Sequence, residues 1–439
     1  MNVPIGDYWD CPTPDPAVCI NNNKKVIVMT LMNARLSAMM FLQFFIWGGW
    51  FVTLGTFLSS QLGASGGQIG VAFSTQSWGA IIAPFVVGLI ADRLFNAERI
   101  LGVLHLVGAV LLYQLYGAHD FSTFYPYVLA YMVIYMPTLA LVNAVAFRQM
   151  RDPGMEFSKI RVWGTVGWIV AGAVISFVFA WDSPAAIPSG GLRNTFLMAA
   201  LASLVLGVYS FTLPSTAPLE TNATRGGTLQ MLGLDALGLL KDRSYLVFFI
   251  ASILICIPLA FYYQNTNPFL AQIGMTNPTA KMAIGQVSEV LFMLLLPLFI
   301  HRFGIKIALL MGMLAWALRY VLFAYGNNGD LAFMLFTGIA LHGVCYDFFF
   351  VSGQIYTDAK TPEHLRSSAQ GLITLATYGV GMLIGFWVAG RVSDYYAGPE
   401  GHHWQSIWLF PACFSLGVVL VFVFAFREAR PRVPAPAKI

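Results

Sequence analysis

The chain has 439 residues and a formal net charge of +4; 58% of its residues are hydrophobic and only 10% are charged. Because soluble domains carry about 25% charged residues, this composition excludes an ordinary soluble enzyme, a disordered chain and a small disulfide scaffold. The mean hydropathy of +0.70 instead predicts a polytopic membrane protein, in which most apolar side chains face lipid or neighbouring helices.

Twelve apolar segments are long enough to cross a bilayer as helices, which takes about 20 residues each. Their continuous apolar runs differ from the alternating pattern of an outer-membrane barrel, so an all-α protein is expected. In chain order, the predicted spans are residues 38–60, 69–93, 99–117, 124–147, 160–181, 194–213, 244–271, 282–302, 306–326, 331–356, 366–396 and 404–427.

A break after the sixth predicted span divides the chain into two halves. It begins with Pro214 and Pro218 and carries Thr, Gly and charged residues, which indicates a linker. The predicted parts are therefore residues 1–31, a flexible N-terminal tail or a mis-assigned start; 32–213, a six-helix bundle; 214–243, a cytoplasmic linker; 244–427, a second six-helix bundle; and 428–439, a cytoplasmic tail.

The placement of positive charge predicts the orientation in the membrane. Twenty of the 24 basic residues fall in segments that lie inside the cell when both termini are cytoplasmic. Arg193, Lys281 and Arg391 fall toward the outside, and Arg319 falls within a span. Because cytoplasmic loops are enriched in Lys and Arg, we expect a multi-pass protein of the cytoplasmic (inner) membrane with both termini in the cytoplasm.

Polar and charged residues inside the spans are the candidate functional groups, because a charge at mid-membrane costs about 2.5–3.5 kcal/mol on insertion scales. In the fifth span, Arg161, Thr165 and Trp168 are spaced so that they share one helical face. In the eighth span, Gln286 and Glu289 share a face in the same way. Further candidates are Tyr263 and Gln264 in the seventh span and His342, Tyr346 and Asp347 in the tenth.

These residue types together suit a polar solute that carries a ring. Aromatic side chains stack on a planar base, while amides and carboxylates bind hydroxyl groups. Burial favours the neutral form of a carboxylic acid, which can then exchange a proton in each transport cycle; Glu289 is the preferred candidate. The alternative interpretations are that Arg161 and Asp347 form a structural ion pair, that Glu289 is a packing residue and that His342 is a hydrogen-bonded core histidine.

The loop between the second and third spans contains Gly88, Asp92 and Arg93. A second loop, residues 301–306, lies at the matching place in the other half, which suggests an internal duplication. The glycine permits close helix approach, and the charges are predicted to act as a conformational lock on the inner side. The Gly-x-x-x-Asp-Arg pattern at this position resembles the loop signature of the major facilitator superfamily.

Several motifs of enzymes are missing or misplaced. Residues 63–67 match G-x-S-x-G, but they lie in a short predicted loop with no preceding strand, so a glycine-rich turn is the better interpretation. The five cysteines are scattered, and no zinc-protease, P-loop or dinucleotide motif occurs. We therefore expect no enzyme activity, no metal and no cofactor.

Seven segments of the chain form a recognisable set: Phe41–Trp50, Met136–Asn143, Ile160–Gly167, Gly285–Glu289, Arg319–Gly326, Tyr346–Phe349 and Ser368–Gly371. Together they resemble the bacterial nucleoside:proton symporters of the major facilitator superfamily, and the resemblance covers roughly residues 32–427. The resemblance implies twelve helices in two rocking bundles and inward transport of nucleosides with protons. It also implies substrate contacts for Arg161, Thr165, Trp168, Gln286, Glu289, His342, Tyr346 and Asp347, with proton coupling by Glu289 and Asp347.

The chain departs from the family's pattern at a few positions. Ala260 and Tyr263 stand where the family has Gln and Asn, and Gln264 is a neighbouring candidate to replace them. The preference for purine or pyrimidine nucleosides therefore stays open. The alternative functions are a proton-coupled carrier of sugars or oligosaccharides, a membrane-embedded hydrolase and a non-transporting sensor. The expected partners are a nucleoside, protons and the lipid bilayer; no nucleic acid is expected, and the protein is predicted to be monomeric.

Overall fold

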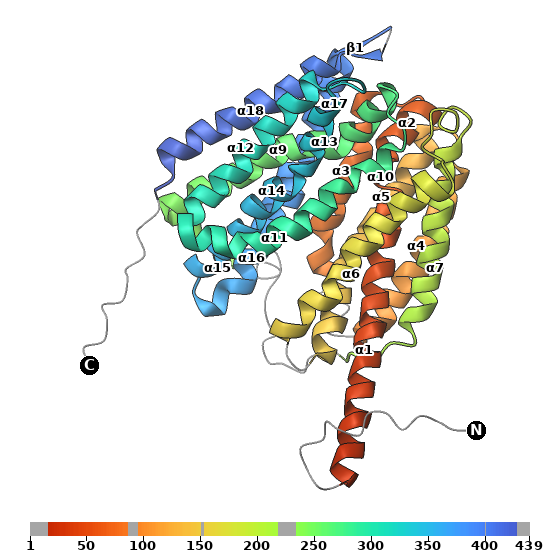
Figure 1. Ribbon diagram of the computed structural model, residues 1–439, viewed down its shortest axis with the longest axis vertical. Coiled ribbons are helices and arrows are strands. Elements are labelled where there is room, and N and C mark those ends of the chain that lie inside the picture. The colour runs from red at the N-terminus through yellow and green to blue at the C-terminus, as the bar shows by residue number, and fades with distance from the viewer. Residues whose placement is uncertain (1–15, 87–94, 151–152, 218–233, 400, 428–439) are drawn as a thin grey trace.

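The computed structural model describes residues 16–86, 95–150, 153–217, 234–399 and 401–427, and these residues are mostly helical (Figure 1). Among them, ten helices are long and apolar enough to cross a membrane. The first two predicted spans correspond to α1 (Pro16–Gly48) with α2 (Leu54–Gln61) and to α3 (Gly66–Val86). The prediction of an all-helical membrane protein is therefore confirmed. The physical reason is that an apolar segment in lipid forms a helix, which satisfies its backbone N–H and C=O groups with hydrogen bonds inside the segment.

Figure 1 shows two bundles side by side, which are closest at the top of the view and further apart at the bottom. Besides α1 to α3, the N-terminal bundle contains α4 (Ala97–Gly117), α5 (Phe121–Gln149), α6 (Pro153–Ala173), the π-helical turn η2 (Val174–Val178), the short helix η3 (Gly191–Arg193) and α7 (Asn194–Ser210). α1 begins at Pro16, within the segment 1–31 that the sequence predicts as a tail.

The C-terminal bundle contains several helices that are interrupted within one span. Its elements are η5 (Leu234–Lys241), α9 (Arg243–Gln272), α10 (Pro278–Met282), α11 (Ile284–Phe303), α12 (Ile305–Tyr325), α13 (Ala332–Ala340), α14 (His342–Tyr346), the π-helical η6 (Asp347–Val351), α15 (Ser352–Lys360), η7 (Glu363–Leu365), α16 (Arg366–Thr374), the π-helical η8 (Leu375–Gly381), α17 (Met382–Tyr395), a small hairpin of β1 (Ala397–Gly398) and β2 (Gly401–His402), and α18 (Trp404–Ala425). Such π-helical turns occur frequently at functional sites.

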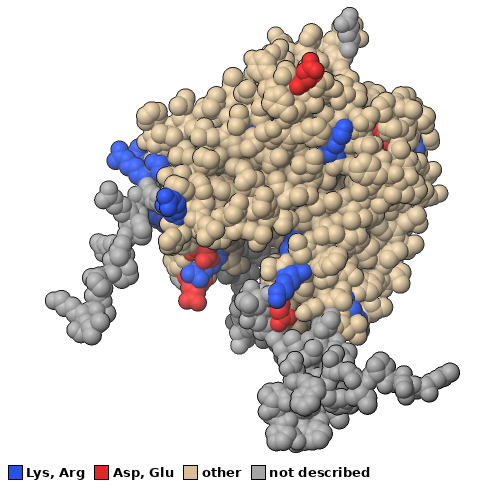
Figure 2. Space-filling view, viewed as in Figure 1, with Lys and Arg blue, Asp and Glu red and all other residues tan. Residues whose placement is uncertain are grey.

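The outer surface is apolar where a bilayer would cover it. Figure 2 shows charged side chains gathered mainly along the left and lower edges of this face, beside a broad region that is nearly free of charge. Large apolar side chains are exposed on this surface; Leu294 and Leu298 of α11 are each 72% exposed and Phe424 of α18 is 80% exposed. An apolar surface of this extent is expected for contact with lipid tails.

Helix starts outside the spans are capped by polar side chains. Ser65 and Gln68 form a reciprocal pair at the start of α3, in which Gln68 N donates to Ser65 Oγ and Ser65 N donates to Gln68 Oε1. The serine of the G-x-S-x-G match is therefore a helix cap. Asp120 caps α5, and hydrogen bonds from the Ser122 hydroxyl and from Thr123 lower the pKa of Asp120 to about 2.

Glycine allows α1 and α6 to touch along their backbones. A Cβ added at Gly167 would lie 2.2 Å from the carbonyl oxygen of Phe41, which is far inside van der Waals contact. We expect Gly167→Ala to destabilise the N-terminal bundle by about 1–3 kcal/mol, as overpacked sites generally do, and to lower the unfolding temperature of purified protein. Gly417→Ala is the matched control, because nothing lies within 4 Å of its added Cβ; equal unfolding temperatures for the two variants would contradict this prediction.

Candidate functional site

A cavity of about 720 Å³ lies between the two bundles. It reaches from the middle of the spans to Pro84 of α3 and Ser367 of α16, toward the side where α1 begins and α18 ends (Figure 1). Eight of the ten predicted substrate-binding residues line it: Arg161, Thr165, Trp168, Tyr263, Gln286, Glu289, His342 and Tyr346. Helical spacing puts the predicted residues of α6 on one face and those of α11 on one face. The packing of the two bundles turns both faces toward the same cavity.

The N-terminal wall of the cavity carries one cation beside several aromatic rings. The guanidinium carbon of Arg161 lies 4.1 Å from the centroid of the Phe44 ring, so α1 supports the side chain through a cation–π contact. Trp168 packs edge-on against Trp47, with the two ring centroids 5.6 Å apart. A Cβ at Gly48 would lie 3.0 Å from the Trp168 ring, so this glycine makes room for the indole.

The C-terminal wall carries a carboxylate beside a histidine. Glu289 Oε2 of α11 lies 3.9 Å from His342 Nε2 of α14. The Tyr346 and Tyr378 hydroxyls form a hydrogen bond at the same wall. This wall therefore presents hydroxyl, imidazole and carboxyl groups toward the cation on the opposite bundle, and a polar solute can bond to both walls together.

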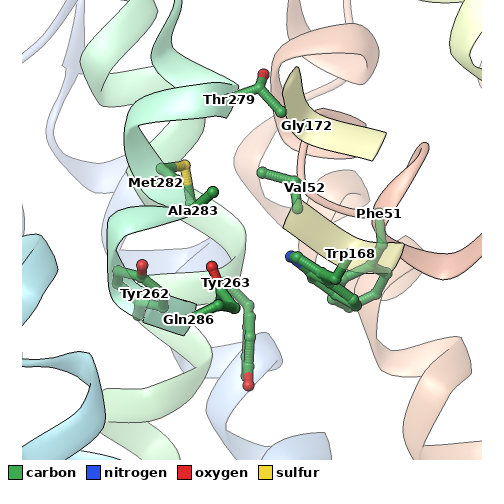
Figure 3. Close-up of a pocket in the computed structure, with 10 residues that line it drawn as sticks. All are labelled: Phe51, Val52, Trp168, Gly172, Tyr262, Tyr263, Thr279, Met282, Ala283 and Gln286. Carbon is green, nitrogen blue, oxygen red and sulfur yellow. The ribbon is translucent and has the colours of Figure 1, made fainter. Parts of the chain in front are cut away.

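A small pocket of about 20 Å³ continues the cavity toward the opposite side of the molecule. Figure 3 shows Trp168 and Phe51 of the N-terminal bundle across from Tyr263 and Gln286 of the C-terminal bundle. These four side chains also line the main cavity. They provide aromatic faces from both bundles together with one amide, which suits a planar ring with polar edges.

Two predicted substrate-binding residues do not line the cavity. Gln264 lies at the seam between the bundles, where its Nε2 donates to the carbonyl oxygen of Gly66 at 3.4 Å. Asp347 is fully buried in η6, and neither of its carboxyl oxygens has a hydrogen-bond partner among the described residues. Both side chains follow a residue that does face the cavity, and one step along a helix turns a side chain by about 100°.

Several other residues that line the cavity were not singled out from the sequence. Gln76 and Tyr378 line the cavity, as do Phe44 and Trp47 of α1. The polar run Ser74–Ser77 within an apolar span is the signal that would have singled out Gln76. The predicted lock residues Gly88, Asp92 and Arg93 lie outside the described residues.

On the side opposite the cavity mouth, a carboxylate joins the bundles. Asp394, at the end of α17, accepts hydrogen bonds from Gly66 N at 2.6 Å and from Gly67 N at 2.8 Å. These two amides lie in the first turn of α3 and have no acceptor within the helix, and the helix dipole there also favours a negative charge. A Cβ at Gly66 would lie 2.7 Å from the carbonyl oxygen of Gly390, so glycine permits the contact.

A second carboxylate also joins the bundles, but this one belongs to the N-terminal bundle and binds the C-terminal bundle. Asp182, which follows η2, accepts from Thr279 N of α10 at 3.0 Å and from the Ser176 hydroxyl at 2.6 Å. Ala280 N in turn donates to the Ser176 oxygen at 3.0 Å. Asp182 follows the fifth predicted span, and Asp394 lies near the end of the eleventh. Asp182 binds residues just before the eighth predicted span, and Asp394 binds residues just before the second. We call these contacts the outer seal; they close the cavity on this side.

The described residues contain no group of three or more His, Cys, Asp or Glu placed to hold a metal. What the cavity offers is one guanidinium, one carboxyl group, amides, hydroxyls and several rings in a space about the size of a small-molecule site. It can bind a polar ring-bearing solute between two bodies that meet at one end, which is the arrangement that alternating access requires.

Comparisons with known proteins agree with this geometry. The family model described as nucleoside H⁺ symporter matches residues 29–431. The chain is 43% identical to the putative nucleoside transporter YegT of Escherichia coli (strain K12), over 92% of this chain and 95% of that protein. It is 34% identical to the xanthosine permease of the same organism, over 90% of this chain and 95% of that protein. The crystal structure of the nucleoside transporter NupG matches with a TM-score of 0.82 and 29% identity, over 91% of this chain and 100% of that chain.

Proposed function

Because the chain belongs to the nucleoside H⁺ symporter family, we propose that it imports nucleosides together with protons through the cavity between its two bundles. The major facilitator fold and the assignment to this family, both predicted from the sequence, are confirmed by these likenesses. The relatives are permeases and transporters rather than enzymes, so the hydrolase alternative is dropped. The observation that carries the proposal is the meeting of Arg161 and Glu289 in one cavity from opposite bundles.

The roles in substrate binding follow from the chemistry of each wall. Trp168 or Tyr346 stacks on the base. Gln286, Glu289, Thr165 and His342 bond to the ribose hydroxyls and to the polar edge of the base. Aromatic rings at both walls support this assignment. When the bundles close around a planar base, each bundle can place a ring against one face of the base.

Proton coupling is assigned to Glu289 and Asp347. Glu289 shares the cavity with Arg161, and Asp347 is buried with no hydrogen-bond donor to its oxygens in the described part of the chain. An ionised carboxylate in such a place is costly. We infer that binding a proton and a nucleoside together offsets the charges of the site, so that the loaded carrier can rock between its two states.

The orientation of the chain follows from the same account. Basic residues of the described chain gather at the side to which the cavity opens, for example Arg148, Arg302 and Lys306, as the positive-inside rule requires of a cytoplasmic face. The structure is then the inward-open state in the inner membrane, with both termini cytoplasmic. We also propose that the protein works as a monomer, that Gly88, Asp92 and Arg93 lock the inner side in the opposite state, and that residues 214–243 link two bundles that rock as units.

Uptake in cells tests the proposal directly. A strain without its own nucleoside carriers should accumulate labelled uridine, adenosine or xanthosine when it expresses this protein, and a protonophore should abolish the accumulation. Excess maltose or sucrose should not compete. Competition by these sugars, or nucleoside accumulation that persists with the protonophore, would contradict nucleoside:proton symport.

The outer seal should favour the inward-open state. Asp394→Ala removes two hydrogen bonds to a charged acceptor, each worth about 1.5–3 kcal/mol, so the outward-open population should rise at least about tenfold. Val52→Cys, which places a thiol in the small pocket, should then react faster with a membrane-impermeant maleimide added from outside.

The matched control is Asp120→Ala, which removes a helix cap on the same side without crossing between the bundles. Labelling of the parent with native cysteines only gives the background to be subtracted. An unchanged labelling rate in Asp394→Ala, or an equal rise in Asp120→Ala, would contradict a sealing role for Asp394.

A further inference from the structure

A buried cation lies behind the C-terminal wall of the cavity. Arg319 of α12 is fully buried, is not a cavity-lining residue, and forms no ion pair with any described carboxylate. Its Nε donates to the carbonyl oxygen of Gly338 at 2.8 Å, and its Nη2 donates to that of Ile339 at 3.3 Å. Because a cation within a membrane-spanning helix is costly to insert, the groups that Arg319 contacts indicate its role.

Those two carbonyls stand at a break in the helix of the tenth span. α13 ends at Ala340 and α14 begins at His342. In a continuous helix Gly343 N would donate to Ile339 O, but here it donates to the hydroxyl of Ser288 at 3.0 Å. Arg319 and Ser288 thus supply the donor and the acceptor that the break would otherwise leave without partners.

The same guanidinium also supports the histidine through an aromatic ring. Its central carbon lies 3.8 Å from the centroid of the Tyr262 ring. Tyr262 in turn stacks on His342, with centroids 5.2 Å apart and planes at 21°. Arg319 is therefore linked to His342 by two routes, through the backbone before it and through the ring beside it.

The break also brings the histidine to the carboxylate. A Cβ at Gly343 would lie 2.6 Å from Glu289 N, so α14 touches α11 at this point and only glycine fits. The result is the 3.9 Å separation of His342 Nε2 and Glu289 Oε2 at the cavity wall.

We propose that Arg319 is a positioning residue for substrate recognition, which holds His342 beside Glu289 so that the two bind neighbouring polar groups of one nucleoside. This inference rests on the proposed function. It assigns Arg319 no contact with the substrate, because the side chain is separated from the cavity by Tyr262 and by the backbone at the break.

The proposal is tested by measuring KM and kcat separately for uridine transport in proteoliposomes. Arg319→Met keeps the length of the side chain but removes the donors, and it should raise the KM for uridine about tenfold, the factor expected for a lost hydrogen bond to a charged group. Arg319→Lys restores a charged donor and should recover part of the affinity. Ser288→Ala removes the acceptor of Gly343 N without touching the cation and should also raise KM, so the proposal stays testable if Arg319→Met fails to fold.

A double-mutant cycle separates positioning from general damage. If Arg319 acts through His342, Arg319→Met should have little further effect on KM in a His342→Gln background. Arg193→Met is the matched control, because Arg193 also bonds two backbone carbonyls, those of Tyr116 and Ala118, but lies away from the cavity. It should lower the amount of folded protein without changing KM.

Three results would overturn the inference: an unchanged KM in both Arg319→Met and Ser288→Ala, additive effects in the cycle, or an equal rise of KM in Arg193→Met. The failure of the proposed function looks different. If the wild type transported neither uridine nor adenosine, nucleoside symport itself would be refuted and the inference with it, whereas wild-type uptake with an unchanged KM in the variants refutes the inference alone.

Discussion

Glu289→Gln should abolish accumulation of nucleoside against its gradient while exchange of internal for external nucleoside continues. Glutamine keeps the shape and the polar contact with His342, 3.9 Å away in the wild type, but it cannot take up and release a proton. Binding should therefore survive while coupling is lost. Measured in vesicles with an imposed pH gradient, labelled uridine should equilibrate but not exceed its external concentration.

A second buried glutamate provides the control for this prediction. Glu98 of α4 is also buried, but its carboxylate accepts from Thr216 N at 2.8 Å, at the start of the predicted linker, and it does not line the cavity. Glu98→Gln should reduce the amount of protein and leave the accumulation ratio unchanged. Normal gradient-driven accumulation in Glu289→Gln would show that Glu289 does not couple the proton.

Arg161→Ala should nearly eliminate transport, with a fall in kcat/KM for uridine of at least about 100-fold, which corresponds to the upper range for one hydrogen bond to a charged group. Among the described residues that line the cavity, Arg161 is the only arginine or lysine. Glu289 lines the same cavity. Removing Arg161 leaves that carboxylate in a cavity within the membrane without a nearby counter-charge, which penalises the ionised form of Glu289.

The control for this variant is Arg148→Ala, at the end of α5, where the side chain is exposed. It should transport uridine at close to the wild-type rate. Arg161→Lys should restore part of the activity, since it returns the charge without the planar fork of donors. Wild-type kcat/KM in Arg161→Ala would contradict the assignment of Arg161 to the substrate site.

The sequence predicted the spans and several faces of the site because those signals are local. A span is a run of apolar residues, and Arg161, Thr165 and Trp168 share a face through helical spacing alone. The pairing of Gln286 with Glu289 is local in the same way. All five line the cavity, which shows that spacing within one helix is sufficient to identify a cavity-lining face when polar residues are rare.

The positions of Gln264 and Asp347 could not be obtained in that way. Each lies in a run of consecutive polar or aromatic residues, and the helices around them are apolar on nearly every side, so no periodicity shows which residue faces the cavity. Gln264 instead bonds across the seam to Gly66, 198 residues away in the chain.

The outer seal depends on tertiary packing for the same reason. Asp394 and Gly66 are separated by 328 residues, and their contact requires that both bundles already have their final shapes. The break before His342 is similarly hidden, because the residues around it, Ile339 to Gly343, read as part of one continuous apolar helix.

The most direct test of the account is proton movement driven by nucleoside. Purified protein in liposomes that contain a pH-sensitive dye should acidify the interior when uridine or adenosine is added outside without a pH gradient, and Glu289→Gln should not. Nucleoside entry by the wild type with no acidification, or equal acidification by Glu289→Gln, would contradict a proton-coupled carrier centred on this cavity.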